Sequence, residues 1–277
     1  MNLIVQGIEV RNHDLKQVAK LAAAARIERV TDQAFRLADA RTRMGVAEYC
    51  GAAELDHAFI DRPQRLADLG LVVMDMDSTL ITIECIDEIA DIVGLKTEVA
   101  AITAQAMRGE LADYAESLRR RVALLAGIEE SALQRVYDER LRLSPGGERM
   151  LAAMRSAGVK TMLVSGGFTF FTERLQKRLG LDYVLSNTLG ISGGKLTGEV
   201  VGDIVDADRK RGGLVRVRDT LGLERDQVLA LGDGANDLEF MREAGTSIAY
   251  HAKPVVRQQA TYALDFVGLD GVLNLFD

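Results

Sequence analysis

The chain has 277 residues, of which 48% are hydrophobic and 27% are charged, a balance typical of a folded globular protein and not of a disordered one. Its net charge of −7 argues against a broad nucleic-acid-binding surface, because such a surface needs clustered Lys and Arg. No stretch has the pattern of a signal peptide or a membrane span. The two cysteines, Cys50 and Cys85, lack metal-ligand spacing, so we expect reduced thiols in a cytoplasmic protein with no nucleic-acid or membrane partner.

Residues 1–66 differ from the rest of the chain and predict a small α+β domain. The stretch NLIVQGIEV has the pattern of a strand, and DLKQVAKLAAAARI has that of a helix with Asp14 as its N-cap. Residues 29–60 are ambiguous between helix and strand. The stretch DRPQRLADLG then interrupts the apolar pattern with a proline and several charges, which marks the end of this domain.

Residues 67–277 alternate between predicted strands and predicted helices. Four short apolar stretches suit central parallel strands: LGLVVMDMD, VKTMLVSGG, DQVLALGDGAND and TSIAY. Helical stretches lie between them and end at glycines such as Gly180 and Gly245. This alternation predicts an α/β fold with a doubly wound parallel sheet.

Two segments depart from the alternation. Residues 85–143 contain no predicted strand, which indicates a helical cap inserted between the first and second core strands. One face of a long helix is predicted there by apolar residues that step by four and three, namely Leu111, Ala115, Leu118, Val122 and Leu125. Farther on, VLSNTLGISGGKLTGEVVG has two strand-like halves around a Gly-Gly pair and predicts a hairpin.

Chemically active residues follow three of the predicted core strands. Ligands of open α/β sheets bind beyond the carboxyl ends of the strands, so these residues should meet. They are Asp75 and Asp77, then Ser165, Gly166 and Gly167, then Asp233, Asn236 and Asp237. Carboxylate oxygens with a few waters suit Mg²⁺, while a hydroxyl and bare backbone N–H groups suit a phosphate. The sequence therefore predicts magnesium-dependent phosphate chemistry at this edge.

The two aspartates of the first strand have different expected roles. Asp75 can attack phosphorus and form an aspartyl-phosphate, as carboxylates can. Asp77 points to the same side of an extended segment and can move protons to the leaving oxygen and from the attacking water. A cation for the phosphoryl group is supplied by Lys210, although Arg209 and Arg211 flank it and remain alternatives.

The order of these motifs resembles a known family. The stretches DMDST, VSGG and GDGAND, with a lysine between the second and third, resemble the haloacid dehalogenase superfamily of phosphotransferases over about residues 70–260. The stretches DSTLITIECIDEIA and SLRRRVALLAG narrow the resemblance to the bacterial branch that hydrolyses phosphoserine. Residues 1–66 are only weakly similar to the amino-acid-binding regulatory domains often joined to such enzymes.

The resemblance implies a role for each site residue. Asp75 would be the nucleophile and Asp77 the general acid/base. Mg²⁺ would be bound by Asp75, the backbone carbonyl of Asp77, and Asp233. The phosphoryl group would be held by four residues, Ser165, Gly166, Lys210 and Asn236. Gly167 and Asp237 would support them.

Two residues of the cap would select the substrate. By the same resemblance, Glu84 would meet the ammonium group of phosphoserine and Arg121 its carboxylate. Arg119, Arg120 and Arg121 are consecutive, so Arg120 remains an alternative to Arg121. On helical spacing, Arg121 lies next to the apolar face whereas Arg119 points away from it.

The expected function is the Mg²⁺-dependent hydrolysis of O-phospho-L-serine to L-serine and phosphate, the last step of serine biosynthesis. One alternative is a related phosphatase or phosphotransferase for another small phosphorylated amino acid or amine, for example one that passes the phosphoryl group to homoserine. A second alternative is a non-catalytic sensor on the same fold, although a sensor would not need Asp77. The sequence leaves the oligomeric state open, with a homodimer among the alternatives.

Overall fold

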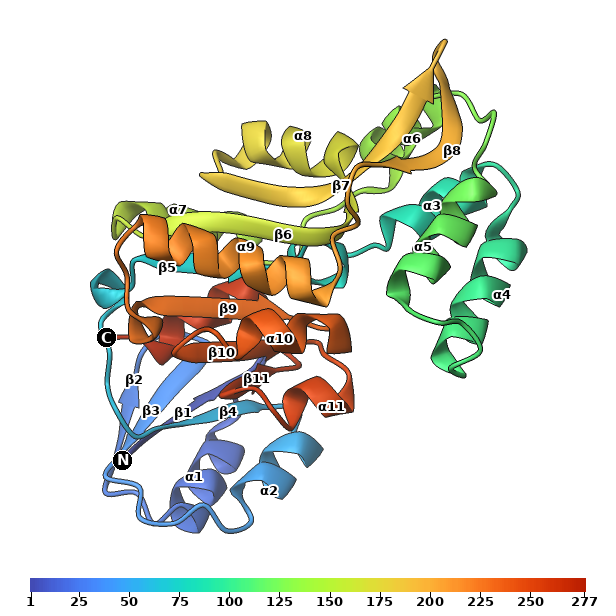
Figure 1. Ribbon diagram of the computed structural model, residues 1–277. Coiled ribbons are helices and arrows are strands. Elements are labelled where there is room, and N and C mark those ends of the chain that lie inside the picture. Colours follow the sequence, from blue (N-terminus) through green and yellow to red (C-terminus); the bar gives the residue numbers. More distant parts are fainter.

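A computed structural model describes residues 1–277, which form an N-terminal domain, an α/β core and a helical cap (Figure 1). The N-terminal domain comprises β1 (Asn2–Gln6), α1 (Asn12–Leu21), β2 (Arg26–Arg29), β3 (Ala34–Ala38), α2 (Val46–Ala52) and β4 (Asp56–Ile60). The cap comprises α3 (Cys85–Ile92), α4 (Lys96–Met107), α5 (Tyr114–Ala123), α6 (Ser131–Arg135) and a π-type turn over Val136–Arg140. No helix is both long enough and apolar enough to cross a membrane.

The core begins with β5 (Leu71–Met74) and continues after the cap. Its later elements are α7 (Gly147–Ser156), β6 (Lys160–Phe168), α8 (Thr169–Leu179), β7 (Tyr183–Ser192), β8 (Lys195–Val201), α9 (Ala207–Thr220), β9 (Val228–Gly232), α10 (Leu238–Met241), β10 (Thr246–Tyr250), α11 (Pro254–Arg257), β11 (Tyr262–Leu264) and a final 3₁₀ helix over Leu269–Leu275. The strand order is β11-β10-β9-β5-β6-β7-β8, and only the β7–β8 pair is antiparallel.

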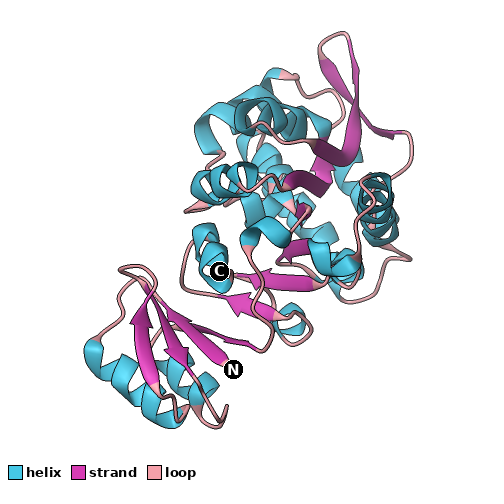
Figure 2. Cartoon of the chain, turned by 90° about the vertical axis from the view of Figure 1, so that its left-hand side faces the viewer, coloured by secondary structure: helices cyan, strands magenta, loops and turns pink.

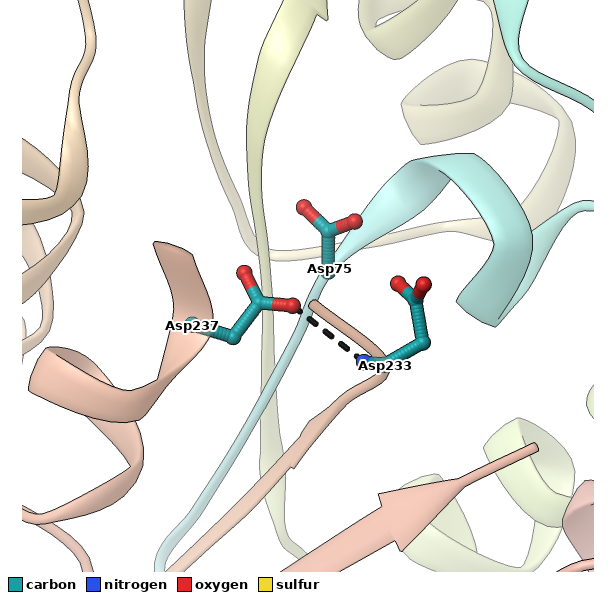
Figure 3. A group of neighbouring side chains, drawn as sticks. All are labelled: Asp75, Asp233 and Asp237. Atoms are coloured by element: carbon teal, nitrogen blue, oxygen red, sulfur yellow. Dashed lines mark hydrogen bonds between the residues drawn. The ribbon is translucent and has the colours of Figure 1, made fainter. Parts of the chain in front are cut away.

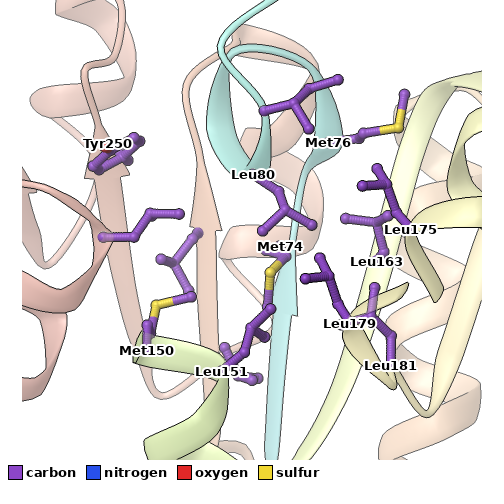
Figure 4. Close-up of a cluster of buried hydrophobic side chains, with 14 of the residues drawn as sticks. Met74, Met76, Leu80, Met150, Leu151, Leu163, Leu175, Leu179, Leu181 and Tyr250 are labelled. Atoms are coloured by element: carbon purple, nitrogen blue, oxygen red, sulfur yellow. The ribbon is translucent and has the colours of Figure 1, made fainter. Parts of the chain in front are cut away.

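Helices cover both faces of this sheet because successive strand residues point to opposite sides. Val72 and Met74 pack with apolar residues of α7 and α8. Figure 4 shows Met74 in this cluster together with Leu151 of α7 and Leu179 of α8. Leu71 and Val73 pack instead with residues of α9 and α10. The predicted fold class, a doubly wound sheet with a helical insertion and a small N-terminal domain, is confirmed.

The N-terminal sheet is antiparallel, with strand order β2-β3-β1-β4. Leu3 and Val5 of β1 pack against α1 and α2, whereas Ile4 points the other way and joins the main hydrophobic cluster of the core. The prediction of Asp14 as a helix N-cap was wrong. Helix α1 already begins at Asn12, and Asp14 lies buried in its first turn, where it accepts a hydrogen bond from Tyr49 Oη at 2.7 Å.

The N-terminal domain is fixed to the core by a buried carboxylate at the start of β4. Asp56, only 3% exposed, accepts backbone N–H groups at 2.6, 3.0 and 3.0 Å from three consecutive residues, Asp265, Phe266 and Val267. A second contact runs from Asn274 Nδ2 to Gln6 Oε1 at 2.7 Å. Figure 2 shows the domain at the end of the molecule opposite the β7–β8 hairpin.

The cap consists of short helices, so the expectation of one long helix was wrong. Helix α5 is bounded at its start by Asp113, whose side chain caps the N–H of Glu116 at 2.7 Å, and Leu111 lies outside it. Leu118, Val122 and Leu125 are nevertheless buried. The β7–β8 hairpin was correctly predicted, and it also contacts the cap: Leu196 exchanges backbone hydrogen bonds with Gly127 and Ile128, each at 2.8 Å.

Candidate active site

The carboxyl ends of β5, β6 and β9 open into a cavity of about 200 Å³ beneath the cap. The polar residues that line it come from both parts of the protein, with Asp75, Asp77, Gly166, Gly167, Lys210, Asp233, Gly234, Asn236 and Lys253 from the core and Glu84, Tyr114 and Arg121 from the cap. Sequence positions as distant as 75 and 233 thus meet in one place, as the strand-end rule predicts.

Asp75 follows the last residue of β5 and is buried, with 5% of its surface exposed. The chain then makes a π-type turn over Met76–Leu80 in which Ser78 has left-handed backbone (φ 57°). Lys210 Nζ donates to Asp75 Oδ1 at 2.5 Å. Burial raises the pKa of Asp75 well above its usual range; the Lys210 ammonium opposes this effect, and the charges of Asp237 and Asp77 add to it.

Lys210 is buried and contacts two carboxylates. Its Nζ also donates to Asp237 Oδ1 at 2.8 Å. Burial alone would lower the pKa of Lys210, but the charges of Asp237 and Asp75 outweigh it and hold that pKa above its usual range. The flanking arginines are exposed, unlike Lys210. Arg209 pairs with Asp203 and Arg211 with Glu243.

Three carboxylates form a group suited to a metal ion (Figure 3). One oxygen from each of Asp75, Asp233 and Asp237 lies within 4.8 Å of the others. Of the three, Asp237 accepts the most hydrogen bonds. Besides the bond from Lys210 to its Oδ1, its Oδ2 accepts the backbone N–H groups of Asp233 at 3.2 Å and Gly234 at 3.0 Å. Burial, followed by the charges of Asp237 and Glu84, raises the pKa of Asp233 to about 6. Mutually repelling oxygen donors of this kind fit a hard divalent cation.

Asp77 is held apart from that group. Its Oδ1 accepts the backbone N–H of Cys85 at 3.0 Å, at the start of α3. Its other oxygen lies close to Gly167, where an added Cβ would stand only 2.8 Å from it. Desolvation, followed by the charge of Glu84, raises the pKa of Asp77 to about 7. A carboxyl group with this pKa can give and accept a proton near neutral pH.

The Ser-Gly-Gly segment lies inside β6 and does not open the helix that follows. Gly166 and Gly167 belong to the end of β6, and α8 begins only at Thr169. Ser165 is fully buried and does not line the cavity in this structure, because its Oγ accepts the N–H of Gly167 at 2.8 Å. The Gly166 carbonyl accepts hydrogen bonds from Asn187 Nδ2 at 2.8 Å and Tyr114 Oη at 3.2 Å.

The cap places two charges of opposite sign at the cavity. Glu84, at the N-cap of α3, accepts from Ser78 Oγ at 2.8 Å. Arg121 of α5 is half-buried and lines the cavity. Arg120 is exposed and pairs with Glu116 on the outside of the same helix, so of these two arginines only Arg121 reaches the cavity.

Comparison with known proteins places this site in a family. A family model described as haloacid dehalogenase-like hydrolase matches residues 72–242, which contain all these motifs. The chain belongs to the haloacid dehalogenase-like hydrolases. A second model, for a domain of unknown function (DUF4072), matches residues 3–46.

This haloacid dehalogenase-like hydrolase is similar to proteins named phosphoserine phosphatase. One from Albidiferax ferrireducens is 54% identical over 218 residues, which cover 77% of this chain and 92% of the relative. A crystal structure of a probable phosphoserine phosphatase from Vibrio cholerae has a TM-score of 0.87 at 39% identity and covers 99% of this chain and 85% of the other. A phospho-aspartyl intermediate analogue of phosphoserine phosphatase has a TM-score of 0.70 at 34% identity, with coverage of 76% and 99%.

Three polar residues near the cavity of this haloacid dehalogenase-like hydrolase were missed from the sequence: Tyr114, Asn187 and Lys253. Lys253 comes three residues after β10, and its N–H donates to the Asp233 carbonyl at 3.0 Å. The strand-end rule, applied to TSIAYHAK as well, would have found it. Tyr114 and Asn187 lie within a helix and a strand, where no such rule applies.

Proposed function

We propose that the protein hydrolyses O-phospho-L-serine to L-serine and phosphate through a phosphorylated Asp75, as the last step of serine biosynthesis. The observation that carries this proposal is the meeting of a buried aspartate–lysine pair from the core with Glu84 and Arg121 from the cap in one cavity. The relative from Albidiferax ferrireducens, named phosphoserine phosphatase and 54% identical, supports the choice of substrate.

Asp75 is the proposed nucleophile. Lys210 neutralises one of its oxygens at 2.5 Å and leaves the other for attack on phosphorus. In the attack, a bond forms between Asp75 and phosphorus while the bond from phosphorus to the serine oxygen breaks. Lys210 also contacts Asp237, which fixes the ammonium group beside the phosphoryl position.

Asp77 is the proposed general acid and base. Protonated, it gives its proton to the departing serine oxygen; ionised, it then takes a proton from the water that attacks phosphorus and releases phosphate from Asp75. The hydrogen bond from the Cys85 N–H at 3.0 Å keeps the carboxyl group at the cavity wall during both steps.

The metal ion proposed is Mg²⁺, held by the side chains of Asp75 and Asp233 and by the backbone carbonyl of Asp77. When bound, it offsets the repulsion between carboxylates and phosphate and stabilises charge that develops on the phosphoryl oxygens. Asp237 is better placed to support than to coordinate, because both of its oxygens already accept hydrogen bonds.

Substrate choice is assigned to the cap. Glu84 would bind the ammonium group of the substrate and Arg121 its carboxylate, so that a phosphorylated amino acid satisfies both charges at once. The core would hold the phosphoryl group with Gly166 and Lys210, joined by Ser165 and Asn236. The Ser165 hydroxyl, which accepts the Gly167 N–H, can donate its own hydrogen to a phosphoryl oxygen without losing that bond.

Phosphate release from O-phospho-L-serine tests this function directly. The purified chain should release phosphate with Mg²⁺ and lose that activity in EDTA, and Asp75→Asn should abolish it. Added homoserine that became phosphorylated would indicate a phosphotransferase. A chain inert toward all small phosphomonoesters with Mg²⁺ would favour the sensor.

The proposal places the enzyme in the cytoplasm, and both cysteines are buried free thiols. The oligomeric state stays open between a monomer and a homodimer. Light scattering of the purified chain would decide between the two.

A further inference from the structure

Asn187 links the end of β6 to the segment before α9 without lining the cavity itself. It lies in β7 with 1% of its surface exposed. Its Nδ2 donates to the Gly166 carbonyl at 2.8 Å, and its Oδ1 accepts the backbone N–H of Val205 at 2.8 Å. The amide orientation follows from chemistry, since a carbonyl only accepts and a backbone N–H only donates.

The first bond fixes a peptide group at the cavity wall. The Gly166 carbonyl and the Gly167 N–H belong to the same planar peptide unit. Asn187 holds the carbonyl end, and Ser165 Oγ holds the N–H end at 2.8 Å. Because glycines have wide backbone freedom, this peptide would otherwise have several accessible orientations.

The second bond reaches the helix that carries Lys210. Val205 precedes Asp206, whose side chain caps α9 by accepting the N–H of Arg209 at 2.9 Å. Lys210 follows in the first turns of that helix. Asn187 therefore connects the Gly166–Gly167 peptide on one side of the cavity to the start of α9, which carries Lys210, on the other.

We propose that Asn187 is a positioning residue. It fixes the Gly166–Gly167 peptide and the start of α9 relative to one another on the two sides of the phosphoryl position. It does not touch the substrate. The inference rests on the proposed function, because it assigns the phosphoryl group to the space between these two parts.

The decisive variant is Asn187→Asp. An ionised carboxylate still accepts the Val205 N–H but cannot donate to the Gly166 carbonyl, whereas a protonated carboxyl group can do both. We expect binding of inorganic phosphate, measured by calorimetry, and kcat for O-phospho-L-serine to fall by about 10-fold at pH 8 and to recover toward wild type as the pH falls. Asp75, Asp77, Glu84 and Asp233 around the cavity also have raised pKa values, so each measured value is taken relative to wild type at the same pH. Lys210 and Tyr114, whose pKa values lie above their usual ranges, stay protonated over this pH range.

Ser186→Ala is the matched control. Ser186 precedes Asn187 in β7, and its hydroxyl pairs with that of Thr172 of α8 at 2.7 Å instead of with Gly166 or Val205. This variant should lose some thermal stability without changing phosphate affinity or kcat. If Asn187→Asp lowered only stability, or if Ser186→Ala reduced phosphate affinity equally, the positioning role would be overturned.

Two further measurements keep the inference separate from misfolding and from the proposed function. If Asn187→Asp does not fold, Asn187→Ser replaces it, and unchanged phosphate affinity in that folded variant would contradict the role. If the wild type binds phosphate but does not hydrolyse phosphoserine, the proposed function fails, while the affinity difference between wild type and variant still decides the role of Asn187.

Discussion

The hydroxyl of Tyr114 lies 3.2 Å from the carbonyl oxygen of Gly166, so a residue of the cap is hydrogen-bonded to the core at the wall of the cavity. The ring lies in the cavity wall, and a Cβ at position 166 would stand only 2.2 Å from the hydroxyl oxygen. Glycine is therefore required at position 166 for the cap to approach this closely.

Removal of that hydroxyl should weaken cap closure. We expect Tyr114→Phe to raise KM for O-phospho-L-serine by about 2- to 10-fold, the effect of one neutral hydrogen bond, because the ring and its packing remain. Tyr137→Phe is the control, since Tyr137 is a partly buried cap tyrosine without such a bond. Equal steady-state kinetics in Tyr114→Phe and wild type would contradict the closing role.

Arg121 and Arg120 offer a matched pair for substrate choice. We expect Arg121→Ala to reduce kcat/KM for O-phospho-L-serine by roughly 10- to 100-fold, because a charged hydrogen-bonding partner of the substrate is lost. O-phosphoethanolamine lacks the carboxylate, so its kcat/KM should change little. Arg120→Ala, which loses only a surface pair with Glu116, should resemble wild type. A comparable loss for both substrates would refute the assignment.

Asp77→Asn separates proton transfer from metal binding. Asparagine keeps an oxygen that can accept the Cys85 N–H, but it cannot transfer a proton, so we expect kcat to fall by about 10²- to 10⁴-fold. The rise in Tm produced by Mg²⁺ should persist, because only the backbone carbonyl of Asp77 is assigned to the metal. Full turnover by this variant would exclude the acid/base role.

The pKa shifts predict how Mg²⁺ binding depends on pH. Asp77 and Asp233 have folded-state pKa values raised to about 7 and about 6. The folded protein therefore holds more protons than the unfolded chain, and these groups reduce stability as the pH rises from about 4 to about 7. Burial and the charges of neighbouring carboxylates disfavour the ionised forms of these groups, and a bound cation offsets that cost. The increase in Tm with Mg²⁺, measured by calorimetry, should therefore be larger at pH 8 than at pH 5.5. Asp233→Asn should remove most of this difference, and a larger increase at pH 5.5 would contradict the prediction.

Asp56 should be the main attachment of the N-terminal domain. Asp56→Ala leaves three backbone N–H groups, one buried and two part-buried, without their acceptor, and we expect the free energy of unfolding to fall by about 2–5 kcal/mol in urea titrations. Asp56→Asn retains one oxygen and should lose less. If both variants matched wild type, the attachment would lie elsewhere.

The core aspartates that the sequence predicted share one physical basis, whereas Glu84 and Arg121 of the cap were predicted from the family resemblance alone. Asp75 and Asp233 follow neighbouring parallel strands, so the fold alone brings them together. Asn187 had no such signal, because its role depends on where β7 runs beside β6 and on a bond to Val205 across the fold. The extent of α5 was misjudged because periodicity ignores capping, and Asp113 starts the helix after Leu111.

The β7–β8 hairpin gives the cap a third attachment to the core. The two linking segments already run side by side through the Ile81–Leu143 bridge, which makes them one joint. The backbone bonds between Leu196 and the α5–α6 loop restrain a second point. Once the Tyr114–Gly166 hydrogen bond breaks, a cap restrained at these two points can rotate only about the line that joins them, so the α4–α5 turn should make the largest excursion and form the entrance for substrate.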